Sequence, residues 1–129
     1  MTDVTYLQPG EFPPPMGPFS AGVRAGSHIF TAGQLPLRSD GTIAGDDITS
    51  QTRQCFANIR SVLQEGGLGL ADVIKLTVWL RDIGDLGAVA EVRREFFTDP
   101  HPVSTTIEIS KLPHADALVE IDAVAVDGR

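Results

Sequence analysis

Cysteine, positive charge and long hydrophobic runs are scarce in this sequence. Cys55 is the only cysteine among the 129 residues, so no disulfide can form within the chain, and nothing indicates an oxidising compartment. No apolar run approaches the roughly 20 residues that a membrane-spanning helix needs. Residues 1–4 lack the basic and apolar stretches of a signal peptide. We therefore expect a cytoplasmic protein that makes no membrane contact.

The shortage of positive charge argues against a nucleic-acid partner. Ten Lys and Arg residues stand against 17 Asp and Glu residues, which gives a net charge of -7 at pH 7. Binding to a phosphate backbone depends on clustered Lys and Arg, and the closest cluster here is Arg93-Arg94. An anionic ligand would therefore need a locally positive site on an otherwise acidic protein.

Length and composition indicate one domain over residues 1–129. The hydrophobic content of 42% is typical of a folded protein with one core. Proline is concentrated near the beginning, where it removes backbone donors and fixes φ. The prolines of this segment are Pro9, Pro13, Pro14, Pro15 and Pro18. We expect residues 1–16 to form an irregular, proline-rich arm.

Five strands are predicted, over residues 19–25, 28–34, 73–80, 103–109 and 118–126. The first two should form a hairpin with a tight turn between them. In the third, apolar side chains alternate with others, which indicates a half-buried strand. The alternating apolar set is Ile74, Leu76, Val78 and Leu80, and the other face carries Thr77 and Trp79.

Two helices are predicted from apolar side chains that recur every three or four residues. The first should begin at Asp46 or Asp47, which suit an N-cap, and end at Gly66, which accepts a helix C-terminus. The second should run over residues 85–98, before Pro100. The expected buried side chains are Ile48, Cys55, Phe56, Ile59, Val62 and Leu63 on the first helix, and Leu86, Val89, Val92, Phe96 and Phe97 on the second.

The order of these elements, β-β-α-β-α-β-β, predicts an α+β sandwich of two layers, in which two helices cover one face of a mixed sheet. The second face would then carry Thr77 and Trp79 beside Val124, Val126 and two carboxylates. A half-apolar face of this size is too large to stay exposed on a small protein. We therefore expect a closed homo-oligomer whose interface is lined by sheet faces.

The last predicted strand carries two carboxylates, Glu120 and Asp122, which alternate with Val119 and Ile121. Two carboxylates on one face of such a strand are costly to bury unless they are paired, hydrated or used in chemistry. An exposed or salt-bridged strand face is the alternative, and periodicity leaves both interpretations open.

Other candidate sites have weaker support. Cys55 belongs to the apolar stripe of the first helix, so a buried, inert thiol is expected. His28, His101 and His114 lack metal-ligand spacing, and we expect surface or loop histidines and no metal. The glycine-rich segment 66–69 follows a helix and matches neither the dinucleotide nor the phosphate-binding pattern.

Six segments, in order, resemble the RidA/YjgF family, also described as L-PSP endoribonucleases. Gly-Pro-Phe-Ser-Ala-Gly at 17–22 resembles the family's G-P-[YF]-S-x-[GA] opening, and Gly-Gln-Leu-Pro at 33–36 resembles its G-Q-[IVL]-P signature. The remaining similar segments are 51–59 in the first helix, 72–82 in the central strand, Leu112-Pro113, and 119–125 in the last strand. The resemblance covers residues 17–126.

The resemblance implies a chorismate-mutase-like fold and a homotrimer that binds a small molecule in three clefts between subunits. It also implies hydrolysis of reactive enamines and imines, such as 2-aminoacrylate, to a keto acid and ammonia, with no cofactor. Such chemistry needs a held water, an acceptor for its proton and an anchor for the substrate. In the family, a glutamate on the last strand orients the water and an arginine binds the substrate carboxylate.

Carried over to this sequence, the catalytic glutamate is Glu120. The arginine position, within the family's P-A-R-[ST] segment, is Ser104 here. Phe19 replaces a frequent tyrosine, and Ala90 replaces a frequent asparagine. The substrate-binding positions that the resemblance implies are Phe19, Ala32, Gly33, Ala90, Ser104, Thr105 and Thr106.

Two hypotheses follow. A Rid-type hydrolase or deaminase would act on an enamine or imine other than the usual small 2-imino acids, because Ser104 cannot form the charge-assisted pair of the missing arginine. The alternative is a non-catalytic trimer that binds a small metabolite or a partner enzyme in the same clefts. Ribonuclease activity is disfavoured by the acidity of the chain. The sequence leaves open whether Arg24, Arg81 or Arg93 reaches the cleft instead.

Overall fold

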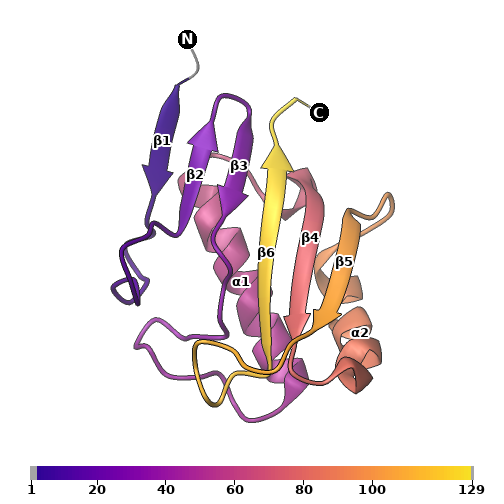
Figure 1. The fold of residues 1–129 in the computed structure, drawn as a ribbon. Coiled ribbons are helices and arrows are strands. Elements are labelled where there is room, and N and C mark those ends of the chain that lie inside the picture. Colours follow the sequence, from indigo (N-terminus) through magenta and orange to yellow (C-terminus); the bar gives the residue numbers. More distant parts are fainter. Residues whose placement is uncertain (1–2, 129) are drawn as a thin grey trace.

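The computed structural model describes residues 3–128, which form a six-stranded sheet with two helices on one face (Figure 1). The strand order is β1-β2-β3-β6-β4-β5, with β4 and β5 parallel and the other neighbours antiparallel. The strands are β1 (Val4–Leu7), β2 (Gly22–Ala25), β3 (His28–Thr31), β4 (Val73–Leu80), β5 (Val103–Glu108) and β6 (Val119–Val126). The helices are α1 (Ile48–Glu65) and α2 (Leu86–Phe96), with single 3-10 turns at Leu70–Asp72 and Ile83–Asp85. The predicted two-layer α+β fold is confirmed.

β1 corrects the expectation of an irregular arm over residues 1–16. Val4–Leu7 pairs with β2, with Tyr6 opposite Val23 and Leu7 opposite Gly22. These four residues precede the prolines, so the backbone donors that a ladder needs are all present. The observed order is therefore β-β-β-α-β-α-β-β, and residues 1 and 2 of the expected arm lie outside the described residues.

Turns and caps bound the elements at several predicted places. β2 and β3 form the predicted hairpin, and Gly26 has a φ of 60° in its turn. Asp47 caps α1, because its carboxylate accepts a hydrogen bond from the Ser50 N–H at 2.9 Å. α1 ends before Gly66 as expected, and the following Gly67 has a φ of 84°.

Two side chains that were expected in the core are exposed. β4 has the predicted bounds, but a bulge between Val73 and Lys75 makes Ile74 an extra residue and turns it out of the alternation. Leu86 begins α2 on the side turned away from α1, and it is 46% exposed. Periodicity predicted the right type of element in both cases. The bulge at Ile74 and the exposure of Leu86 depend instead on contacts between elements, which periodicity does not show.

The core lies between the sheet and the helices. Phe56 of α1 is fully buried, and its ring centroid lies 5.2 Å from that of Phe96 and 5.3 Å from that of Phe97. The opposite sheet face has no helix over it (Figure 1). By register, this open face carries exposed apolar side chains from three strands, β1, β3 and β5, namely Val4, Tyr6, Phe30, Val103 and Ile107. Within residues 3–128, neither helix has the length and apolar character that crossing a membrane requires.

Gln51 joins α1 to two loops although its side chain is fully buried. Its Nε2 donates to the carbonyl oxygens of Gly45 and Asp116, at 3.2 and 3.0 Å, and its Oε1 accepts from the Leu118 N–H at 2.7 Å. One side chain thus satisfies backbone groups in the loop before α1 and in the loop before β6. This arrangement fixes where β6 begins.

Replacing Gln51 by leucine should lower the free energy of unfolding by about 1.5–4.5 kcal/mol, because three part-buried backbone groups would lose their hydrogen bonds, at about 0.5–1.5 kcal/mol each. Urea unfolding at one protein concentration, followed by circular dichroism, measures the change. Gln64→Leu is the matched control, since Gln64 is exposed on α1, and it should change stability by less than about 0.5 kcal/mol. Equal stability of Gln51→Leu and the wild type would contradict the bridging role.

Candidate functional site

Glu120 lies on β6, on the sheet face that the helices leave open. In the ladder with β4 it lies opposite Trp79, and Asp122 lies opposite Thr77. Glu120 is half-buried, and Asp122 Oδ2 accepts a hydrogen bond from Trp79 Nε1 at 3.1 Å. Neither carboxylate takes part in the three ion pairs formed by residues 3–128. This strand face is therefore neither salt-bridged nor fully exposed.

Gly33 lies directly against the Glu120 carboxylate. Residues 32–34 were expected to extend the hairpin, but they cross to β6, where Gln34 N–H donates to Ile121 O at 2.7 Å and Ile121 N–H donates to Gln34 O at 3.1 Å. The Ala32 carbonyl accepts from Gln34 Nε2 at 3.2 Å. A Cβ at position 33 would overlap Glu120 Oε1. Glycine is therefore required at position 33 if the carboxylate is to keep its place.

The surroundings of Glu120 favour its protonated form. Burial raises the pKa of Glu120 above its ordinary value, and the nearby Asp122 carboxylate raises it further. A carboxylate with a raised pKa takes up a proton more readily than an ordinary one does, which is the property that a general base needs. Among residues on this face, Glu120 is thus the side chain best suited to exchange a proton with a ligand.

Cys55 lies behind the Gln34 bridge and shows no sign of reactivity. It is fully buried on α1, and its Sγ donates to Gln34 O at 3.2 Å. Burial, and then the charge of Glu120, raises the pKa of the Cys55 thiol well above its ordinary value. The prediction of a buried, inert thiol is confirmed, because a reactive cysteine needs an accessible site that favours the thiolate.

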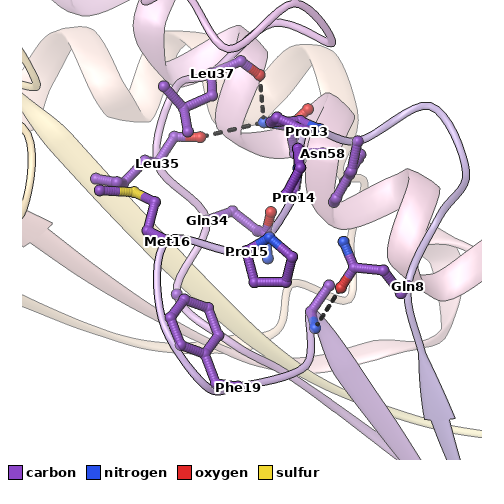
Figure 2. Close-up of a pocket in the computed structure, with 13 residues that line it drawn as sticks. Gln8, Pro13, Pro14, Pro15, Met16, Phe19, Gln34, Leu35, Leu37 and Asn58 are labelled. Carbon is purple, nitrogen blue, oxygen red and sulfur yellow. Dashed lines mark hydrogen bonds between the residues drawn. The ribbon is translucent and has the colours of Figure 1, made fainter.

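A mostly apolar pocket of about 80 Å³ adjoins Gly33 (Figure 2). Proline-rich residues 12–16 form one wall and the segment after β3 forms the other. Asn58 of α1 holds the second wall, since its Nδ2 donates to the carbonyl oxygens of Leu35 and Leu37 at 3.1 and 2.9 Å. Phe19 also lines the pocket and is 54% exposed. Two predicted substrate-binding positions, Phe19 and Gly33, therefore meet at one pocket.

Ser104 and Thr106 lie on the other side of the sheet from Glu120. In the parallel β4–β5 ladder they lie opposite Leu76 and Val78, which are fully buried under the helices. Side chains at paired positions of neighbouring strands point to the same face. Both hydroxyl groups therefore belong to the helix side of the edge strand β5.

Hydrogen bonding and register agree on the orientation of β5. Glu108, two residues after Thr106, accepts a hydrogen bond from the Ile83 N–H at 3.0 Å, just before α2. Thr105 lies opposite Thr77 and so shares the open face with Glu120.

The structure thus divides the predicted site residues into two groups. Phe19, Ala32, Gly33, Thr105 and Glu120 belong to the open face and its adjoining pocket, whereas Ser104 and Thr106 lie on the helix side, the layer that also holds Ala90 of α2.

Of the three arginines that the sequence left open, Arg93 stands apart. Arg24 forms an ion pair with Asp127 at 2.9 Å, and Arg81 donates to the Ala115 carbonyl at 3.0 Å. Arg93, in the last turn of α2, is half-buried, and its Nε is buried without a hydrogen-bond partner. Burial also lowers the pKa of Arg93. No sequence signal separates these arginines, because burial and pairing appear only in the folded chain.

The histidines lie apart from one another. His28 and His101 are exposed, and His114 accepts a hydrogen bond at Nδ1 from the Asp116 N–H at 3.1 Å. In the described part of the chain, no three His, Cys, Asp or Glu side chains are grouped so that they could hold a metal ion.

Comparison with known proteins agrees with the motifs. The family model for endoribonuclease L-PSP matches residues 10–127. A RutC family protein of Pyrococcus horikoshii is 43% identical over 114 residues, which cover 88% of this chain and 90% of that protein. A 2-iminobutanoate/2-iminopropanoate deaminase of Salmonella typhimurium is 32% identical over 117 residues, or 88% of this chain and 91% of the deaminase.

The solved structures show the same fold. Escherichia coli TdcF, crystallised with bound serine, superposes with a TM-score of 0.88 at 32% identity, and the match covers 96% of this chain and 99% of TdcF. The family model and these relatives thus extend over nearly the whole sheet and both helices. The chain belongs to the RidA/YjgF family, whose model is described as endoribonuclease L-PSP.

Proposed function

We propose that the protein hydrolyses an enamine or imine metabolite to a carbonyl compound and ammonia, with Glu120 as the proton acceptor. The observation that carries the proposal is the Glu120 carboxylate, half-buried against Gly33 with a raised pKa. Two relatives, from Salmonella typhimurium and Dermatophagoides farinae, are named 2-iminobutanoate/2-iminopropanoate deaminases.

The reaction needs little from the protein beyond positioning and proton transfer. A water oxygen bonds to the imine carbon while Glu120 takes one proton from that water. Glu120 returns that proton to the nitrogen, which gives a carbinolamine. Glu120 then takes the remaining hydroxyl proton and passes it to the amino nitrogen, so the carbon–nitrogen bond breaks and ammonia leaves as the carbonyl forms. Water and imine balance the products, so no oxidant or further co-reactant enters. Thr105 and the backbone at Ala32 and Gly33 contribute substrate contacts in this proposal.

The working unit in this proposal is a homotrimer with a small-molecule ligand in each cleft between subunits. Two observations support it. Apolar side chains such as Tyr6 and Phe30 are exposed on the open sheet face, and a face of this kind marks an interaction surface. The predicted site residues also fall on both sides of one sheet, so Glu120 of one subunit can meet Ser104 only if the latter comes from a neighbour.

The substrate that we propose differs from the usual small 2-imino acids, because Ser104 offers a hydroxyl where the family's arginine would offer a charge. The same replacement favours one alternative, a non-catalytic trimer that binds a metabolite in these clefts. Cleavage of RNA is not proposed despite the description of the family model, because a chain with a net charge of -7 repels a phosphate backbone.

Release of ammonia from imines generated in situ, starting with 2-aminoacrylate and extending to larger imines, tests the function. Glu120→Gln should lower kcat by about 100-fold or more, in line with the usual contribution of general acid–base catalysis. The variant should be at least as stable as the wild type at pH 7, since burial and Asp122 disfavour the charge that glutamine lacks.

Glu65→Gln, at an exposed position at the end of α1, is the matched control and should leave turnover unchanged. If the wild type released no ammonia from any imine, the binding alternative would be preferred. Unchanged turnover in Glu120→Gln would instead remove the role given to this glutamate while leaving the activity in place.

The raised pKa of Glu120 predicts the position of the acid limb of the pH–rate profile. Glu120 must be ionised to accept a proton, so kcat/KM should fall as the pH drops through a value above that of an ordinary glutamate. Asp122→Asn removes the repelling charge and keeps an acceptor for Trp79, and it should shift this limb to lower pH.

Asp127→Asn removes the same charge just beyond the end of β6, seven residues from Glu120, or about 23 Å at about 3.3 Å per residue. Because salt screens charges beyond about 8–10 Å, the acid limb should stay where it is in the wild type. An identical shift in both variants would mean that net charge, rather than the Glu120–Asp122 contact, sets the limb.

Sedimentation equilibrium tests the assembly. The wild type should show the mass of three chains, and Phe30→Glu should weaken the trimer, because it places a charge on the apolar open face. Gln64→Glu adds the same charge on the exposed side of α1 and should leave the trimer intact. A monomeric wild type at micromolar concentration would rule out the proposed clefts.

A further inference from the structure

Arg93 is a cation in the described chain without an acidic partner, although acidic residues are close to it in sequence. Glu91 pairs with Arg94 at 2.6 Å, and Glu95 pairs with Arg53 at 2.8 Å. Arg93 appears in none of the ion pairs of residues 3–128, and its Nε is buried without a partner. An arginine that is half-buried and unpaired is costly to the fold. Its charge is therefore available to a ligand.

The position of Arg93 on α2 turns it toward the edge strand β5. One side of α2 faces α1, as the Glu95–Arg53 ion pair and the contact of the Phe96 and Phe56 rings show. Leu86, Ala90 and Arg93 are spaced by four and three residues, so they form a stripe that borders the buried Val89 and lies on the flank opposite Glu95. In Figure 1, α2 lies behind the β5 end of the sheet. Since Glu95 faces α1, the opposite flank of α2, which carries this stripe, is turned toward the sheet edge formed by β5.

Arg93 and Ser104 are at the same level along that side. The Glu108–Ile83 hydrogen bond ties the end of β5 to the beginning of the α2 segment. Ser104 lies four residues back from Glu108, about 13 Å along the strand at about 3.3 Å per residue. Arg93 lies ten residues beyond Ile83, about 15 Å along the helix at about 1.5 Å per residue. The hydroxyl of Ser104 and the guanidinium of Arg93 thus belong to one corner of the molecule, which is formed by the Leu86–Ala90–Arg93 stripe of α2 and the helix side of β5.

Small side chains leave this corner open. Ala90 and Ser104 are both small, and Leu86, on the same stripe, is exposed at 46%. The corner combines one guanidinium, two hydroxyl groups from Ser104 and Thr106, and an apolar border. A guanidinium binds a carboxylate through two parallel hydrogen bonds, and hydroxyl groups can complete the set of donors.

We infer that Arg93 is the anion-binding group of the cleft, so the substrate is an imine or enamine that carries a carboxylate. The inference rests on the proposed function, because the cleft joins this corner of one subunit to the Glu120 face of its neighbour. A guanidinium that reaches the site from α2 replaces a charge that the strand position Ser104 does not supply. It also provides the local positive charge that an anionic ligand needs on an acidic protein.

Calorimetric titration with stable product analogues tests the inference. The probes are 2-oxohexanoate and 2-oxooctanoate, which are larger than the products of the usual small 2-imino acids, with hexan-2-one and octan-2-one as partners that lack the carboxylate. Arg93→Met should weaken the binding of either 2-oxo acid about 10- to 100-fold, the range expected for a charge-assisted hydrogen-bonded pair. Binding of the ketones should not change. Arg93→Lys keeps the charge without the fork of donors and should recover part of the affinity.

Arg94→Met is the matched control, because the neighbouring Arg94 is exposed and paired with Glu91. It should bind the 2-oxo acids as the wild type does. The midpoint of thermal unfolding of Arg93→Met should equal or exceed that of the wild type, since methionine has no buried donor to satisfy. A structural role for Arg93 would instead lower the midpoint.

The inference fails if Arg93→Met binds the 2-oxo acids as tightly as the wild type, if Arg94→Met loses the same affinity, or if the wild type does not bind them. The ammonia assay separates these failures from failure of the proposed function. Binding that depends on Arg93 without ammonia release would support the anion site and reject the deaminase. Ammonia release at the same KM in Arg93→Met and the wild type would support the deaminase and reject the anion site.

Discussion

The insertion of β6 between β3 and β4 is the constraint on which the rest of the structure depends. Without it, the β1–β2–β3 unit and the β4–β5 pair would share no ladder, because both reach the common sheet only through β6. Gln51 sets the beginning of this strand, and the bridge between Gln34 and Ile121 ties the segment after β3 to it. The close approach of Gly33 to Glu120 follows from these two contacts. The pairing that completes the sheet therefore also brings Gly33 and Glu120 together.

Two charged groups remain in this fold at a cost to stability. Glu120 is half-buried beside another carboxylate, and Arg93 has a buried nitrogen with no partner. A chain selected for stability alone would replace both, since unpaired buried charges are among the more destabilising features of a protein. Destabilising charged groups of this kind are typically found at functional sites, where they interact with a ligand. The two groups lie on opposite sides of the same sheet, so the chain carries a carboxyl group with a raised pKa on one side and an unpaired cation on the other.

Periodicity predicted much of the fold, and it failed where distant contacts decide. The bounds of β4 were predicted correctly, because apolar side chains alternate with others over most of its length, although the bulge at Ile74 was not foreseen. β1 was missed, since four residues without alternation become a strand only by pairing with β2. Alternation and the family resemblance both pointed to Glu120, yet neither could show that Gly33 lies against it. That Ser104 and Glu120 point to opposite faces of the sheet could be seen only from the register of β5 with β4. That Arg93 lacks an acidic partner could be seen only from the ion pairs that Glu91 and Glu95 form with other arginines.

The central place of β6 also bears on how the protein is made. This strand follows the other five along the chain, so a ribosome releases the β1–β2–β3 unit and the β4–β5 pair before the strand that joins them. Until then, β3 and β4 each present an unpaired edge, the kind of surface at which chains associate wrongly. Glu120 arrives on the same segment that closes both edges. A nascent chain therefore gains the carboxylate that we propose as the proton acceptor in the same step that completes the sheet.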